Sequence, residues 1–210
     1  MADRSPLSSG VLQEIRARII LSTPADHLLL HETELAKQYG VSRTPIRRMI
    51  QALVHEKLLT TQTGVGSVPV DLIPGNRGQD FLVYAQIARA SAQVPSNRVT
   101  ADIRMRMMGI AQLARLETQK TPELFVRTAL ESAYATSDIV RDPILSEALA
   151  NARFRTIRWL VQDCRANPNP FWVRTVGNFD RAARILAEND PALYLETVAD
   201  IVETMSKAAG

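Results

Sequence analysis

Four side chains able to bind DNA fall within six residues of the sequence: Arg43, Thr44, Arg47 and Arg48. Arginine and threonine carry the donors that reach guanine edges and phosphate oxygens in a major groove. A helix beginning at Arg43 would present all four in its first turn and a half. The spacing therefore predicts a recognition helix that reads a DNA sequence.

The residues before this segment predict the turn that would position it. Gly40 suits the left-handed conformation that ends a helix, and Ser42 is expected to cap the next one. Pro45 falls in the first helical turn, where its missing N–H costs nothing. Two helices around such a turn form a helix-turn-helix.

Apolar spacing extends the prediction to a winged helix. Val11, Leu12, Ile15 and Ile19 recur at helical intervals, and Ser8 or Ser9 is expected to cap their helix. Further helices are predicted at 32–39 and 43–57, with Ile46, Met49, Ile50 and Leu53 facing the core. Two β-prone runs, 58–62 and 67–70, flank a glycine turn, so we expect a hairpin with its tip at Gly64 to Gly66. A glycine at Gly66 would allow close approach to DNA.

The second half is predicted to be entirely helical. Segment 71–78 is rich in turn residues, and we place domains at 1–74 and 79–210 with a linker at 75–78. The fold class is mainly α: a winged helix-turn-helix of three helices and a β-hairpin, then an all-α bundle with ligand sites between facing helices. The expected bundle helices are 79–92, 98–119, 122–141, 143–165, 171–188 and 191–207. Trp159, Phe154, Phe171 and Trp172 are expected in the core or an interface.

Composition restricts the function classes. The 210 residues carry 25 basic and 22 acidic side chains, a formal net charge of +3, so a nucleic-acid surface must be local. The segment from Ala36 to Lys57 contains five basic residues and one acidic residue. The single cysteine, Cys164, excludes an internal disulfide. Charges interrupt the N-terminal apolar stretch, so we expect a soluble cytoplasmic protein without a signal peptide or membrane span.

The sequence resembles the GntR family of bacterial transcriptional regulators, in its FadR-like branch. Residues 32–36, 40–47 and 64–66 match that family's winged helix. The second half is similar to the FCD ligand-binding domain of the same branch, at positions that include Arg104, Gly109, Asp138, Glu147, Asn151 and Asn189-Asp190. The resemblance implies that Arg43, Thr44 and Arg47 meet bases and phosphates, with Gly66 near the minor groove. Thr33 and Val65 stand where the family often has arginine, and Arg48 where it usually has glutamate.

The resemblance also raises the question of a metal. Many FCD domains bind a divalent ion through one aspartate and three histidines. Asp138 matches the aspartate, but Asp142 occupies the first histidine position, and all histidines of this chain (His27, His31 and His55) lie in the first half. An all-oxygen site of Asp138, Asp142, Asn178 and Asp200 would suit magnesium, calcium or manganese. We favour a metal-free pocket and expect no cofactor.

The resulting hypothesis is a ligand-responsive regulator, usually a repressor in this family. It would bind a palindromic double-stranded operator as a homodimer, through Ser42, Arg43, Thr44, Arg47, Arg48 and Gly66. A small organic acid or similar effector would bind Arg104, with Asp138 and Asp142 as further candidates, although helix capping is the simpler role for Asp142. One alternative is a DNA-binding dimer whose helical half senses nothing. An enzyme is a weaker alternative, because no serine-histidine-acid set or phosphate loop occurs.

Overall fold

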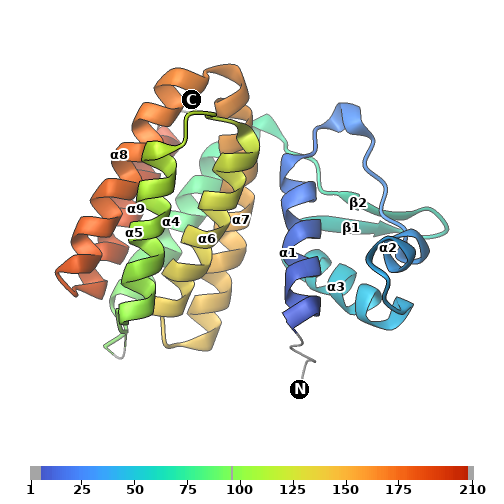
Figure 1. Ribbon diagram of the computed structural model, residues 1–210, viewed down its shortest axis with the longest axis horizontal. Coiled ribbons are helices and arrows are strands. Elements are labelled where there is room, and N and C mark those ends of the chain that lie inside the picture. Colours follow the sequence, from blue (N-terminus) through green and yellow to red (C-terminus); the bar gives the residue numbers. More distant parts are fainter. Residues whose placement is uncertain (1–5, 96, 208–210) are drawn as a thin grey trace. The chain divides into compact units, whose positions relative to one another are not determined.

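A computed structural model describes residues 6–95 and 97–207, with side chains for 10–95 and 97–206. The chain forms two compact units, one ending at Asp71 and one beginning at Leu72 (Figure 1). Each unit has its own core and is described by itself.

The first unit is the predicted winged helix. Its helices are α1 (Pro6–Leu21), α2 (Glu32–Tyr39) and α3 (Arg43–His55), with a 3₁₀ turn at Pro24–Asp26. Strands β1 (Leu59–Gln62) and β2 (Gly66–Pro69) pair antiparallel in a hairpin. The core contains the predicted face of α3 and the apolar face of α1: Ile15, Ile19, Ile20, Ile46, Met49, Ile50 and Leu53 are buried.

The hairpin is anchored by a contact that the sequence did not predict. Leu30, in the segment before α2, forms a two-way backbone bridge with Ser67 of β2, with N···O distances of 2.9 and 3.1 Å. Backbone groups paired in this way are satisfied away from water. The base of the wing is thus joined to the start of the helix-turn-helix.

A buried ion pair joins α1 to the end of α3. Arg16 donates from Nε and Nη2 to the two carboxylate oxygens of Glu56, at 2.9 and 2.6 Å. The Arg16 side chain is 5% exposed and that of Glu56 12%. Two parallel bonds in this environment fix the relative placement of the two helices.

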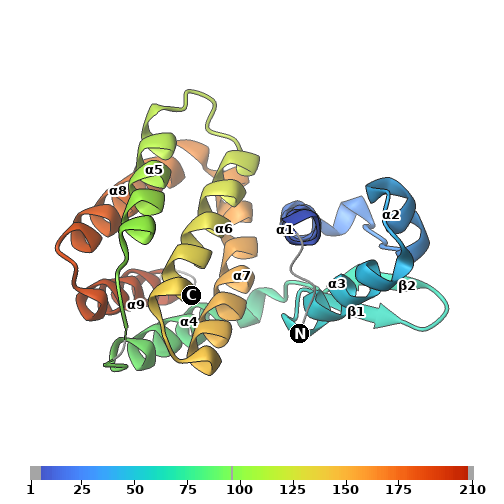
Figure 2. The same ribbon diagram turned by 60° about the horizontal axis from the view of Figure 1, so that its bottom comes forward.

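In the described residues of the second unit, 72–95 and 97–207, six helices form a ring. They are α4 (Arg77–Ala92), α5 (Ala101–Leu116), α6 (Pro122–Ile139), α7 (Pro143–Ala166), α8 (Pro168–Ala187) and α9 (Pro191–Lys207). Neighbouring helices pack in the order α4, α7, α6, α5, α8, α9, and α9 closes the ring on α4 (Figure 2). The ring therefore brings the first and last helices of the unit together.

A polar residue before proline marks the start of several of these helices. Thr121 and Asp142 accept capping bonds from backbone N–H groups three residues on, at 3.2 and 2.9 Å, and a proline follows each. Asp190, before Pro191, accepts one from Leu193 at 2.9 Å. Proline at the first helical position has the required φ and loses no hydrogen bond. The predicted capping role of Asp142 is confirmed.

Several predicted boundaries were wrong. Helix α8 begins at Pro168 rather than at residue 171. Pro168 and Pro170 both fall in its first turn, where a proline does not interrupt the helix. Helix α5 is shorter than predicted, since Thr100 caps its start and Glu117 is extended after its end. Helix α4 begins at Arg77 rather than Gln79, α3 ends at His55, and α1 begins at Pro6, which puts Ser8 and Ser9 inside that helix instead of at its cap.

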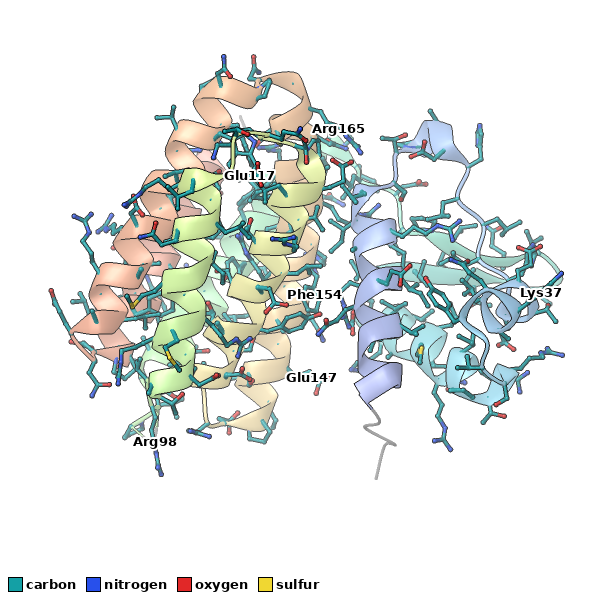
Figure 3. The ribbon with its side chains drawn as sticks, viewed as in Figure 1. Lys37, Arg98, Glu117, Glu147, Phe154 and Arg165 are labelled. Carbon is teal, nitrogen blue, oxygen red and sulfur yellow. The ribbon has the colours of Figure 1, made fainter. Side chains whose placement is uncertain are left out.

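Aromatic side chains and ion pairs hold the ring together. Phe154 of α7, labelled in Figure 3, meets Tyr134 of α6 edge-on at 5.8 Å. Arg77 of α4 makes a double hydrogen bond with Asp163 of α7, at 2.9 and 2.7 Å. The four aromatic residues expected in the core or an interface, Trp159, Phe154, Phe171 and Trp172, are all buried.

Candidate nucleic-acid interface and helical cavity

The turn between α2 and α3 has the geometry of a helix-turn-helix. Gly40 ends α2 with φ 65° and ψ 30°, as predicted, and its N–H donates to the carbonyl of Ala36. Ser42 occupies the capping position of α3, but its side chain makes no capping hydrogen bond, so this predicted role was wrong. Ser42 is exposed.

Helix α3 separates an apolar face from an exposed polar one. Ile46, Met49, Ile50 and Leu53 are buried, which directs the opposite face outward. The five residues predicted to meet DNA on this segment, Ser42, Arg43, Thr44, Arg47 and Arg48, are all exposed. Their donors can therefore reach an external ligand without rearrangement of the core.

One carboxylate of α2 faces this polar surface. Glu32 accepts hydrogen bonds from Arg47 Nε, at 3.1 Å to each carboxylate oxygen, and from Arg47 Nη2 at 3.0 Å. Its Oε2 lies 3.5 Å from Arg43 Nη2. The hydrogen bonds from Arg47 lower the pKa of Glu32, so the carboxylate stays ionised at neutral pH.

Gly66 has a structural reason to be glycine. Its φ is 140°, and a Cβ atom there would lie 3.0 Å from Leu29 Cδ1, 3.1 Å from the Leu30 carbonyl oxygen and 3.2 Å from His31 Cε1. The backbone at Gly66 packs closely on the segment that leads into α2. At the wing tip, Gly64 has φ 76° and Val65 is 47% exposed.

A small cavity of about 80 Å³ lies inside the helical ring. Helix α5 is the one ring helix that contributes nothing to its lining among the described residues. The polar residues that line the cavity are Tyr84, Ser132, Thr136, Arg153, Arg174, Thr175, Asn178 and Tyr194. The rest of the lining is apolar and partly aromatic, the usual composition of a small-molecule site.

The cavity is electropositive. Arg153 and Arg174 both line it, no aspartate or glutamate does, and neither arginine pairs with a carboxylate of a described residue. Burial raises the pKa of Tyr84 and of Tyr194, so both hydroxyls stay protonated. Tyr194 Oη lies 2.7 Å from Thr136 Oγ1. Two cations and neutral donors favour a negatively charged ligand.

The effector residues expected from the sequence do not line this cavity. Arg104 donates to the Val99 carbonyl and to Asn189 Oδ1, both at 3.2 Å. Arg106 donates to Asp138 Oδ2 at 2.6 Å, while Asp142 caps α7. The three expected residues therefore lie outside the cavity, each held in a contact on the bundle itself.

The proposed oxygen ligands are likewise held by different partners. Asp138 pairs with Arg106, Asp142 with the α7 backbone, and Asp200 accepts from Arg89 at 2.9 Å; Asn178 lines the cavity. Within the described ranges, no three histidine, cysteine, aspartate or glutamate side chains gather as metal ligands would. This donor set does not fit a divalent ion.

Within residues 6–95 and 97–207, no helix is long and apolar enough to cross a membrane.

Sequence reasoning missed Glu32, Arg153 and Arg174. Glu32 is fifteen residues from Arg47, so no local spacing links them, although an acid at the start of the helix before a recognition helix was a usable signal. Arg153 and Arg174 lie on the consecutive helices α7 and α8, and both line the cavity. Nothing in their immediate sequence marks them.

Comparisons with known proteins agree with this geometry. Residues 7–68 match the model of bacterial regulatory proteins of the gntR family. The E. coli McbR/YncC structure has a TM-score of 0.63 at 15% identity, and the match covers 96% of this chain and 95% of that one. A structure described as a transcriptional regulator GntR from Rhodococcus sp. RHA1 has a TM-score of 0.62 at 15% identity, with 98% and 100% covered. No curated protein matches the sequence. Residues 7–68 thus match the helix-turn-helix domain of the GntR family, and the chain shares its fold with these two solved structures.

Proposed function

We propose that this protein is a ligand-responsive transcriptional repressor that binds a palindromic operator as a homodimer. The observation that carries the proposal is the exposed face of α3, where Arg43, Thr44, Arg47 and Arg48 project from a helix whose opposite face is buried. A dimer would place two such helices in successive major grooves, one helical turn of DNA apart.

The effector would be a small organic anion bound in the helical cavity. Arg153 and Arg174 supply positive charge to a site without carboxylates, and the neutral Tyr84 hydroxyl adds a donor, whereas the Tyr194 hydroxyl donates to Thr136. A cavity of about 80 Å³ has room for a compact ligand only. This cavity replaces Arg104, Asp138 and Asp142 as the proposed effector site. In the alternative of a helical half that senses nothing, Arg153 and Arg174 would serve only as packing partners of the Tyr84 and Phe171 rings, at 5.6 and 5.9 Å.

The DNA-binding proposal is tested by selecting preferred sequences from a random duplex library with the full-length protein. We expect a two-fold symmetric site, because a closed dimer presents the same surface twice. Sedimentation should show two protein chains per bound duplex. A library that yields no preferred sequence would overturn the proposal.

Single substitutions then identify the residues that read the selected site. Arg47→Ala should weaken operator binding by about 1–3 kcal/mol if Arg47 makes a bidentate base contact. Arg43→Ala should also weaken binding and should reduce its salt dependence, as expected for a lost phosphate contact. Arg181→Ala, which removes an exposed arginine from α8, is the charge-matched control and should leave the affinity unchanged. Equal affinities for all three variants would remove Arg43 and Arg47 from the interface.

A further inference from the structure

Glu32 occupies an unusual place for an acid, on the surface that would face a polyanion. Its side chain is 27% exposed, and it lies between Arg43 and Arg47, which are 59% and 56% exposed. An exposed ion pair of this kind contributes little to folding. A carboxylate there also repels phosphate, so it weakens binding to any DNA. A role in discriminating between DNA sequences would account for both features.

The contact leaves one edge of the Arg47 guanidinium available. Glu32 occupies Nε and one side of Nη2, while Nη1 has no partner among the described residues. A guanidinium is planar with five N–H donors, so the free edge still offers parallel N–H groups from Nη1 and Nη2. Such a pair matches the O6 and N7 acceptors of guanine.

Arg43 is held much less firmly. Its one close approach to Glu32 is 3.5 Å, whereas the bonds from Arg47 to Glu32 are 3.0–3.1 Å long. Its side chain is therefore free to follow a phosphate, whereas Arg47 must break three hydrogen bonds with Glu32 to do so.

We propose that Glu32 is a specificity-determining residue, which holds Arg47 in a base-reading orientation and hinders its contact with phosphates. On an operator, Arg47 keeps its contact with Glu32 and adds the bonds to guanine. On unrelated DNA, where no guanine is in place, Arg47 would gain a phosphate only by leaving Glu32. Glu32 thus weakens non-specific binding more than operator binding. The inference rests on the proposed DNA-binding function.

The test compares Glu32→Gln with Glu34→Gln in the full-length protein. Both residues lie in the first turn of α2 and lose one negative charge, but Glu34 is exposed and contacts neither arginine. The dissociation constants are measured for the selected operator and for a scrambled duplex at several salt concentrations. Glu32→Gln should lower the ratio of specific to non-specific affinity about tenfold, within the range that one bidentate base contact provides. It should also steepen the salt dependence on scrambled DNA by about one counterion, because Arg47 gains a phosphate.

Two further variants separate orientation from charge. Glu32→Asp keeps the charge but shortens the side chain, so it should also lower the ratio. In an Arg47→Ala background, Glu32→Gln should have no further effect on the ratio of specific to non-specific affinity. A ratio for Glu32→Gln equal to that of Glu34→Gln, or an unchanged ratio for Glu32→Asp, would overturn the inference.

The outcomes distinguish this inference from the function beneath it. If the library yields an operator and Arg47→Ala weakens binding to it, while Glu32→Gln leaves the ratio unchanged, the role of Glu32 alone is wrong. If the library yields no preferred sequence, both proposals fail. Melting temperatures within the range of the Glu34→Gln control would show that the Glu32 variants are folded.

Discussion

At the scale of single residues, arginines in this protein differ by what surrounds them. Arg16 is enclosed and bonded to Glu56, Arg47 is exposed and bonded to Glu32, and Arg48 is exposed without a partner among the described residues. Burial decides what each contact is worth, since water screens an exposed pair but not an enclosed one. Arg16 is therefore important for stability, and Arg47 is available for recognition.

Removing Arg16 should destabilise the first unit. Arg16→Met leaves the mostly buried Glu56 carboxylate without its partner, which should cost about 3 kcal/mol. Chemical denaturation followed by circular dichroism, with hydrogen exchange at the α3 amides, measures the loss. Arg18→Met, an exposed position on the same helix, is the control and should change stability little. Replacing Arg16 and Glu56 together by Met should restore most of the loss, and failure to do so would contradict the ion-pair explanation.

At the scale of elements, the wing depends on contacts outside its own hairpin. Strand β2 pairs with β1 and also bridges Leu30, and Gly66 packs against the same segment. The wing and the start of α2 thus form one structural element. This explains why a glycine is needed at a position that the sequence alone assigned to contact with DNA.

Gly66→Ala should be more harmful than Gly64→Ala. Both residues have positive φ, but only at Gly66 would a Cβ atom meet neighbours, including the Leu30 carbonyl at 3.1 Å. We expect a loss of about 2–3 kcal/mol at Gly66 and about 1 kcal/mol at Gly64. Thermal unfolding of both variants measures the difference. Equal losses would mean that backbone conformation alone, and not close packing, restricts position 66.

The elements were largely predictable from sequence because their signals are local. Apolar spacing identified the buried face of α3, and threonine or aspartate before proline marked the starts of α6, α7 and α9. Contacts between distant residues were not predictable in this way. The bridge from Leu30 to Ser67 and the contact from Glu32 to Arg47 depend on how the elements pack, which no spacing rule encodes.

At the scale of the whole molecule, the proposal requires that the helical ring and the DNA-binding unit influence each other. An anion that binds the cavity would alter operator affinity only if it favours one arrangement of the ring. The cavity is itself a property of the closed ring, since its two arginines come from α7 and α8 and its tyrosines from α4 and α9.

Small carboxylates should raise the melting temperature of the full-length protein. Arg153→Gln and Arg174→Gln should remove the effect, because each deletes a cation from the cavity, while Arg181→Gln on the exposed surface of α8 should not. Any carboxylate that shifts operator affinity must have its own affinity shifted by operator DNA by the same factor. Titration calorimetry with and without operator checks this equality. Retained stabilisation in both cavity variants would place the ligand elsewhere.

The closure of α9 on α4 has a consequence for signalling. Tyr84 and Tyr194 bring α4 and α9 to the cavity, and α4 continues the chain directly from the 3₁₀ turn at Pro74–Asn76 that follows the winged helix. A ligand that displaces Tyr84 would therefore move α4, the helix that follows the connecting segment between the two units. Ligand binding would then act on the winged helix through the connecting segment. Inserting flexible residues into that segment should reduce the change in operator affinity on ligand binding, while the affinities for ligand alone and for DNA alone stay the same.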